Sequence, residues 1–147
     1  MYVGYIGITD QNWFSFNKSN NHKEVVFWRR ASFPVNLPIG MPFFFLVKGT
    51  KPRYIRGYGI VKLIGSDKID ILWNKYGSKM GEASLSSVED LIRKDKNEKI
   101  GYYILENVKY IEERFDLKNF RIEFPDSIVS GKKINEEDTN KLLSSFK

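Results

Sequence analysis

The chain has 147 residues and a net charge of +6, from 24 Lys and Arg against 18 Asp and Glu, which is the size of one domain covering residues 1–147. It has no Cys and one His, so thiol catalysis, disulfide frameworks and Cys/His zinc sites lack their residues, and a Ser-His-Asp triad has only His22 to use. A chain of this length buries roughly two thirds of its unfolded surface, so packing alone has to hold its fold together.

The N-terminal residues, MYVGYIGITD, contain neither the basic segment nor the apolar core of a signal peptide, so we expect a cytoplasmic protein. The longest apolar run, residues 41–47, contains Pro42 and is far shorter than the about 20 residues of a membrane span. We therefore expect no membrane contact.

The first half of the chain carries all of the excess positive charge. Residues 1–74 hold 10 basic and 4 acidic residues, whereas residues 75–147 hold 14 of each. Aromatic residues are interleaved with these cations, a composition typical of surfaces that bind polyanions and flat rings. A protein with a merely uneven surface is the alternative. The cations are Arg29, Arg30, Lys48, Lys51, Arg53 and Arg56, and the aromatic residues are Trp13, Phe16, Phe27, Trp28, Phe33 and Tyr54.

The first half begins with a predicted strand at 2–9, which is apolar on both faces and therefore suits the centre of a sheet. Thr9 and Asp10 then offer a cap to a short helix that carries Trp13, Phe14 and Phe16. Three β-prone runs follow, at 25–28, 43–48 and 54–64. The segment between the first two contains three prolines and Gly40, which predicts a long ordered loop of the kind that carries function.

The second half predicts shorter elements. They are a helix at 68–76, a helix at 85–94 capped by Ser84, strands at 100–105 and 108–111 that form a hairpin or one bulged strand, a weak strand at 121–124, an irregular segment at 124–133 and a helix at 136–146. The expected fold is α+β, with a small curved mixed sheet or pseudo-barrel of five or six strands surrounded by short helices.

Motifs of catalysis are absent from the sequence. It contains no phosphate loop, no dinucleotide fingerprint and no nucleophile elbow. The acidic clusters at 112–116 and 136–138 are interpreted as a solvated face and a helix start. We therefore expect no enzyme, no metal and no cofactor.

Trp28 ends a β-prone run and opens the irregular loop, a place where an indole can form the flat wall of a pocket. Stacking of a base on an aromatic side chain is worth ~1–3 kcal/mol. Thr9 and Asp10, at the exit of the first strand, can hydrogen-bond the Watson–Crick edge of that base. Core packing is the alternative for Trp28 and for Trp13.

Short motifs also follow one another in a recognisable order. They are Ile6–Asp10 with Trp13-Phe14, Phe27-Trp28, Gly40–Phe45, Gly57–Val61, Trp73–Gly77 with Ala83–Leu85, Ile100–Leu105 and Ile128–Lys132. This order resembles the N-terminal module of a family of HNH-type restriction endonucleases, and it is similar to the wider PUA-like group of EVE, YTH and ASCH domains. The resemblance implies a pseudo-barrel that binds a modified or flipped base in an aromatic pocket.

The resemblance also implies roles for single residues. Trp28 becomes a wall of the aromatic cage, Thr9 and Asp10 its polar end, and Tyr110 a second aromatic. Ser130, Gly131 and Lys132 match a closing I-V-x-G-K segment that touches the ligand or its backbone. The expected base pocket is Thr9, Asp10, Trp13, Trp28 and Tyr110, and the expected nucleic-acid backbone contacts are Arg29, Arg30, Lys48, Lys51, Arg53, Arg56, Ser130, Lys132 and Lys133.

These expectations describe a DNA-binding specificity domain of a modification-dependent restriction system that recognises a methylated base, with modified DNA favoured over RNA. Because no HNH or ATPase motif occurs in the sequence, cleavage would belong to a nuclease or ATPase domain or subunit elsewhere. One alternative is a PUA- or YTH-type reader of a modified ribonucleotide. Another is a small modified-nucleoside hydrolase with Asp10 as its base, and a third is a scaffold protein that binds no nucleic acid.

Overall fold

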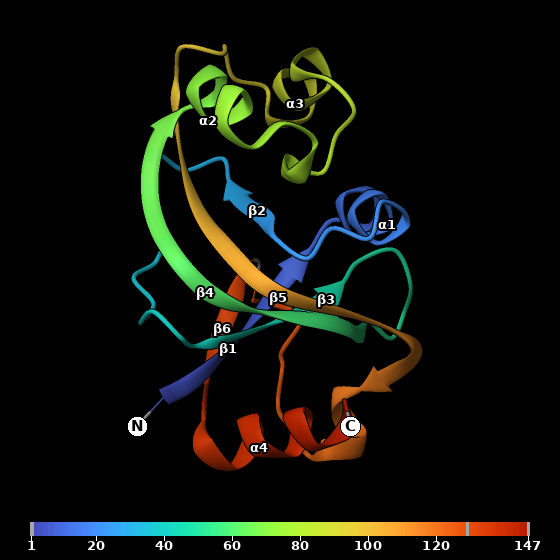
Figure 1. Ribbon diagram of the computed structural model, residues 1–147. Helices are drawn as coiled ribbons and strands as arrows, with labels where there is room; N and C mark the ends of the chain where they lie inside the picture. The colour runs from blue at the N-terminus through green and yellow to red at the C-terminus, as the bar shows by residue number, and fades with distance from the viewer. Residues whose placement is uncertain (1, 129, 147) are drawn as a thin grey trace.

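A curved, six-stranded mixed sheet organises the computed structural model, which describes residues 2–128 and 130–146 (Figure 1). The strand order is β2-β5-β4-β3-β1-β6. The elements of the described residues are β1 (Tyr2–Thr9), α1 (Gln11–Ser19), β2 (Val25–Arg29), β3 (Pro42–Val47), β4 (Tyr54–Lys68), α2 (Ile69–Tyr76), the 3₁₀ helix η1 (Gly77–Met80), α3 (Leu85–Ile92), β5 (Lys99–Asp116), the 3₁₀ helix η2 (Leu117–Phe120), β6 (Gly131–Asn135) and α4 (Glu136–Ser145).

The pairing of β1 with its neighbours determines the edge of the sheet at which the central strands end. β1 runs parallel to β3 and antiparallel to β6, and the remaining pairs are antiparallel. Thr9 lies opposite Val47, so both parallel strands end at the same edge of the sheet. Their carboxyl ends are the place where ligands bind in open sheets with parallel strands.

The two longest strands give the sheet its curvature. β4 and β5 have 15 and 18 residues, and their register shifts at three places. Such bulges bend and twist a strand, and Figure 1 shows both strands sweeping along the sheet from η2 to α2. The sheet thereby half encloses the core.

Three clusters of buried hydrophobic residues lie between the sheet and the helices that cover it. One lies under α1 and contains Trp13 and Phe43, a second lies under α4 and contains Phe44, and a third lies under α2 and α3 and contains Met80. Successive residues of a strand point to opposite faces, so the adjacent residues Phe43 and Phe44 serve two different clusters. The two-sided burial expected for β1 is confirmed, because Tyr5 belongs to the first cluster and Ile6 to the second.

The α+β class with six strands is confirmed, and so are the predicted helix caps. The Asp10 carboxylate accepts the N–H of Trp13 at 2.9 Å, and Ser84 caps α3. For the strands expected at 100–105 and 108–111, the sequence left a hairpin or one bulged strand open. Residues 99–116 form one bulged strand, with Asn107 at φ 52°.

Two expectations for the last third of the chain are wrong. Residues 121–124 are not a strand, because Arg121 has a left-handed backbone (φ 57°) that ends η2. The strand β6 begins instead inside the segment 124–133 that was expected to be irregular, and it continues to Asn135. The motif Ile128–Lys132 includes Val129, which lies outside the described residues, as do Met1 and Lys147 of the expected domain. No helix in the described part of the chain is long and apolar enough to cross a membrane.

Candidate functional site

A pocket of about 220 Å³ opens at the edge where β1, β2 and β3 end. Six of the residues expected at a nucleic-acid site line it. Three come from the expected base pocket and three from the expected backbone contacts, although the sequence separates them by up to 38 positions. The pocket is lined by Ile8, Asp10, Trp13, Phe27, Trp28, Arg29, Arg30, Lys48 and Leu91.

Two indoles contribute to the pocket in different ways. Trp28 is half-buried, and its Nε1 donates a hydrogen bond to the carbonyl of Met80 at 2.8 Å, which fixes the plane of the ring. Trp13 is 3 % exposed, donates from Nε1 to the carbonyl of Val26 and packs edge-on against Phe27. Trp28 therefore forms a wall of the pocket, whereas Trp13 is chiefly a core residue that reaches the pocket with part of its ring.

Asp10 supplies the acidic group of the pocket. Its Oδ2 accepts the backbone N–H of Trp13 and thereby begins α1. Among the hydrogen bonds of the described residues, its Oδ1 takes part in none, so this oxygen remains an acceptor for a ligand. A carboxylate at the positive end of a helix is also electrostatically stabilised.

Arg29 ties the pocket to two other segments. Its guanidinium donates to the carbonyls of Ile8 at 3.2 Å and Ser130 at 2.6 Å, and it lies 4.6 Å from the centre of the Phe27 ring. Burial lowers the pKa of Arg29, but an arginine remains protonated in proteins. Two carbonyls and an aromatic face therefore hold a half-buried positive charge in a fixed orientation.

Two further cations stand at the rim. Arg30 donates from Nε to the carbonyl of Ile92 at 3.0 Å, which joins the loop after β2 to the end of α3. The backbone N–H of Lys48 donates to the carbonyl of Thr9, and its side chain is exposed. Cations at the mouth attract an anionic ligand toward the pocket.

Glu82 is a neighbour of the pocket that sequence reasoning missed. Burial, and then the nearby Asp10 carboxylate, raise the pKa of Glu82. Gly81, directly before it, adopts φ 89°, and a Cβ there would overlap the Trp13 ring. The sequence holds no signal for this proximity, because 72 residues separate the two carboxyl groups.

Thr9 and Tyr110 do not line the pocket, which corrects two expectations. Thr9 is fully buried and its hydroxyl donates to the carbonyl of Gly7. Tyr110 packs edge-on against Phe14 and donates its hydroxyl hydrogen to the carbonyl of His22. Both hydroxyls are occupied within the protein, and the two residues support the pocket from behind.

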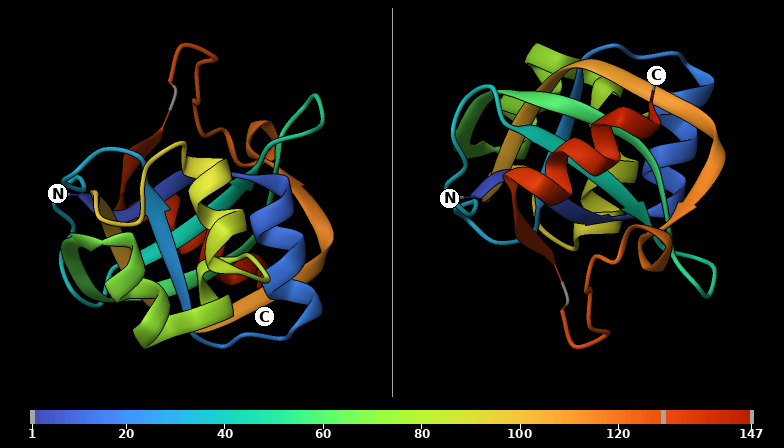
Figure 2. Two further views of the ribbon diagram at one scale, coloured as in Figure 1. Left: turned by 90° about the horizontal axis from the view of Figure 1, so that it is seen from above. Right: turned by 90° about the horizontal axis from the view of Figure 1, so that it is seen from below.

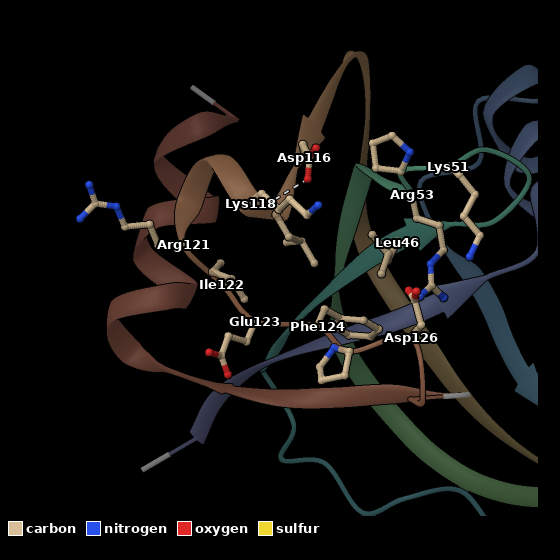
Figure 3. Close-up of a pocket in the computed structure, with 13 residues that line it drawn as sticks. Leu46, Lys51, Arg53, Asp116, Lys118, Arg121, Ile122, Glu123, Phe124 and Asp126 are labelled. Carbon is tan, nitrogen blue, oxygen red and sulfur yellow. Dashed lines mark hydrogen bonds and ion pairs between the residues drawn. The ribbon is translucent and has the colours of Figure 1, made fainter.

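The expected backbone contacts divide into separate places. Arg29, Arg30, Lys48 and the Ser130 carbonyl lie at the pocket. Lys51 and Arg53 line a second hollow (Figure 3). Lys132 lies beside the same hollow, because it donates to the carbonyl of Glu123, which lines it. Arg56 lies over the Phe14 ring, and Lys133 is exposed on β6.

The described residues contain no group of three or more His, Cys, Asp and Glu side chains that could hold a metal ion.

Comparisons with known proteins identify the fold. No family model matches the chain, and no curated protein matches it. Three solved structures of an ASCH protein from Zymomonas mobilis do match, each at 20 % identity. The unmodified protein has a TM-score of 0.67 and covers 95 % of this chain and 94 % of its own. A serine-to-alanine variant has a TM-score of 0.70 with 100 % coverage of both chains, and a tyrosine-to-phenylalanine variant has 0.67 with 95 % and 96 %.

These structures support the PUA-like part of the expected resemblance, whereas the likeness to HNH-type restriction endonucleases stays a prediction. The match extends over nearly the whole length of both chains, so it concerns the complete architecture and not one motif. The chain therefore has the same fold as these ASCH structures.

Proposed function

We propose that this chain is a nucleic-acid-binding module that takes one modified base into the pocket beside Trp28. The observation that carries the proposal is the fixed indole wall, held by the Nε1 hydrogen bond to Met80, across a pocket that also contains the Asp10 carboxylate and three cations. ASCH proteins share this fold, and their PUA-like group includes base readers.

The size of the pocket favours a single flat ring. Its volume of about 220 Å³ is below the about 300–1,000 Å³ of pockets for drug-sized ligands. A base that stacks on Trp28 gains ~1–3 kcal/mol. A methyl group on that base adds apolar area against the ring, and this gain distinguishes a modified base from a plain one.

The polar groups suit the edge of a base. The free Oδ1 of Asp10 accepts a hydrogen bond from an exocyclic amine, as carboxylates do with cytosine N4. Arg29 and Arg30 supply donors for ring nitrogens and carbonyls. Lys48 at the rim supplies charge for a phosphate, which positions the nucleic acid without reading its sequence.

A binding role is favoured over catalysis because most of the polar groups of the pocket serve the structure. Trp28, Arg29 and Arg30 each donate to a backbone carbonyl. We propose that modified DNA is the target and that a nuclease in another domain or chain uses the recognition. Competition between DNA and RNA strands of the same sequence tests the first part, because RNA readers use the 2′-hydroxyl.

One observation supports a second candidate, a modified-nucleoside hydrolase. The Asp10 carboxylate helps to raise the pKa of Glu82, and a carboxyl with a raised pKa beside a second carboxylate is an arrangement used for general acid–base catalysis. Product release from a free modified nucleoside, and its loss in Asp10→Asn, would promote this candidate. Asparagine also caps helices, so this variant changes the chemistry and leaves α1 in place.

The decisive experiment compares two variants of Trp28. Labelled duplexes and single strands carry cytosine, 5-methylcytosine, 5-hydroxymethylcytosine or N6-methyladenine, each at low and high salt. Trp28→Ala should weaken the binding of the modified strand about tenfold and remove its preference over the plain strand, whereas Trp28→Phe keeps a ring and most of both. Both variants lose the bond to Met80, so their difference reports the loss of the ring and not the loss of that bond. Unchanged preference in Trp28→Ala would refute the assignment of the pocket.

A further inference from the structure

We propose that the large hollow beside the pocket is a groove for the single strand of nucleic acid that continues from the bound base. This inference rests on the proposed function and adds a second site to it. The groove has a volume of about 1100 Å³, five times that of the pocket, and thirteen residues line it (Figure 3). Binding of a base in the pocket assigns no role to this groove.

Two segments far apart in sequence form the walls. One wall is the turn between β3 and β4, with Lys51 and Arg53, and the other is η2 with the segment 121–126. Figure 2 shows the β3–β4 turn and the segment 121–128 protruding from the same edge of the molecule. Leu117 and Ile122 are buried beneath them. The groove thus has an apolar floor between two raised walls.

The charge of the groove favours a polyanion. Four cations line it, Lys51, Arg53, Lys118 and Arg121, against three acids. Two of those acids already interact with groups of the protein. Asp116 caps η2 by accepting the N–H of Lys118 at 3.0 Å, and Asp126 forms an ion pair with Arg53 at 3.3 Å. Among the ion pairs of the described residues, Lys51, Lys118 and Arg121 take part in none.

The third acid, Glu123, has a cation beside it. Its backbone carbonyl accepts a hydrogen bond from Lys132 at 2.7 Å, so a fifth cation stands at the same wall. Proteins follow single strands with a positively charged groove and aromatic side chains on which bases stack, and Phe124 lines this groove.

Short stretches of chain connect the residues of the pocket with those of the groove on two sides. Lys48 lines the pocket and Lys51 lines the groove, and three residues of chain span at most about 11 Å. On the other side, Arg29 of the pocket donates to the carbonyl of Ser130, four residues after Asp126 of the groove. A strand whose base enters the pocket therefore has the groove as its neighbouring surface.

Asp126 gives the proposal its sharpest test. Its side chain is 84 % exposed, while that of Arg53 is 17 % exposed and lies over the Phe124 ring. Figure 3 shows the two charged groups facing each other. Arginine binds carboxylate and phosphate with the same planar donor set, so Asp126 occupies the place that a phosphate would take. Removing its charge should strengthen binding.

The experiment measures binding of labelled single strands of about nine nucleotides, with and without a central 5-methylcytosine, in both DNA and RNA form. The free mononucleotide serves as a ligand too short to reach the groove. The variants are Lys51→Ala with Lys118→Ala, and Asp126→Asn. Lys75→Ala removes an exposed lysine of α2, which lies at the opposite end of the molecule from η2, and it is the matched control.

The double lysine variant should bind the long strands about tenfold more weakly and lower the salt slope by about 1.4. Asp126→Asn should bind them about threefold more tightly, because the lost pair is a weak exposed one. Mononucleotide binding should not change in either variant. These effects should be equal for methylated and plain strands.

Every other outcome contradicts one part of the two proposals. Groove variants that behave like Lys75→Ala overturn the groove, and the pocket stands if Trp28→Ala still loses the preference for methylated strands. Groove effects without any preference for a modification leave the groove and overturn the reader. Tighter binding of a poly-glutamate peptide than of the strands would reassign the groove to an acidic partner. No binding of any strand by the unaltered protein overturns both proposals.

Discussion

The pocket and the groove differ in how firmly their side chains are held. In the pocket, Trp28 and Arg29 donate to three backbone carbonyls. In the groove, the side chains of Lys51, Lys118 and Arg121 make no hydrogen bond within the described residues. A fixed site discriminates between ligands because it pays no ordering cost on binding. Loose cations instead add affinity that is independent of sequence and sensitive to salt.

The largest expected effect tests whether the side chains of the pocket are held rigidly. Arg29→Ala leaves the carbonyls of Ile8 and Ser130 without their charged donor, and each such bond is worth about 1.5–3 kcal/mol. We expect a loss of about 3–4 kcal/mol in the free energy of unfolding, measured by urea denaturation.

Two variants control this result. Arg29→Lys keeps the charge but cannot reach both carbonyls at once, so it should recover only part of the loss. Lys118→Ala in the groove should cost less than about 0.5 kcal/mol. If Arg29→Ala and Lys118→Ala have equal stability, the pocket is not the more rigid of the two sites.

A glycine behind the pocket gives the next largest effect. Gly81 adopts φ 89°, and a Cβ there would overlap the Trp13 ring. Gly81→Ala should cost about 2–4 kcal/mol, the sum of a left-handed backbone and overpacking. Gly40 adopts φ 90° and an added Cβ there would meet no atom within 4 Å, so Gly40→Ala should cost only about 1–2 kcal/mol. Thermal unfolding measures both, and equal costs would mean that the Trp13 ring yields freely.

Local signals in the sequence were enough for most elements of the fold. Asp10 and Ser84 stand where caps are needed, and β1 has the apolar pattern of a central strand, so these elements were predictable. β6 was not, because its sequence GKKIN buries one apolar side chain, Ile134. Its pairing with β1 makes it a strand, and pairing between distant segments leaves no local pattern.

The site was predictable where one residue type carries the signal. Trp28, Asp10 and Lys48 line one pocket, and their roles in binding a base and its backbone stay predictions. The Thr9 side chain does not line the pocket because that of its neighbour Ile8 does, and adjacent residues of a strand point to opposite faces. Glu82 comes from the segment after η1, and only the packing of η1 against β2 brings it near the site. The groove was missed because segments far apart in sequence build its walls.

A smaller effect separates the two roles of Asp10. Its Oδ2 caps α1 and its Oδ1 is free for a ligand. Asp10→Ala removes both and should cost about 1 kcal/mol of stability. Asp10→Asn keeps a capping oxygen and should cost a few tenths, about 0.3 kcal/mol. Both should weaken the binding of strands with a methylated or a plain cytosine to the same extent, measured with the same panel of strands, because both bases carry the N4 amine that Oδ1 accepts. Unchanged binding in Asp10→Asn would show that the charge of Asp10 is not used.

The smallest expected effect concerns the carboxyl group beside the pocket. Burial and Asp10 raise the pKa of Glu82 above its ordinary value of 4.5. The folded state therefore favours the protonated form, and the contribution of Glu82 to stability is fully present below pH 4.5 and is lost as the pH rises through the raised value. Glu82→Gln should be slightly more stable than the unaltered protein at pH 7, by less than about 1 kcal/mol, with the difference vanishing at acidic pH.

Glu24 provides the control of opposite sign. A hydrogen bond from Lys62 is the largest cause that lowers the pKa of Glu24 below 4.5. Its contribution is therefore present above pH 4.5 and is lost as the pH falls through the lowered value. Glu24→Gln should be slightly less stable at neutral pH and equal in acid, as measured by urea denaturation across the pH range. If Glu82→Gln shifts in the same direction as Glu24→Gln, then the folded state stabilises Glu82 as an anion, which contradicts the raised pKa of this group.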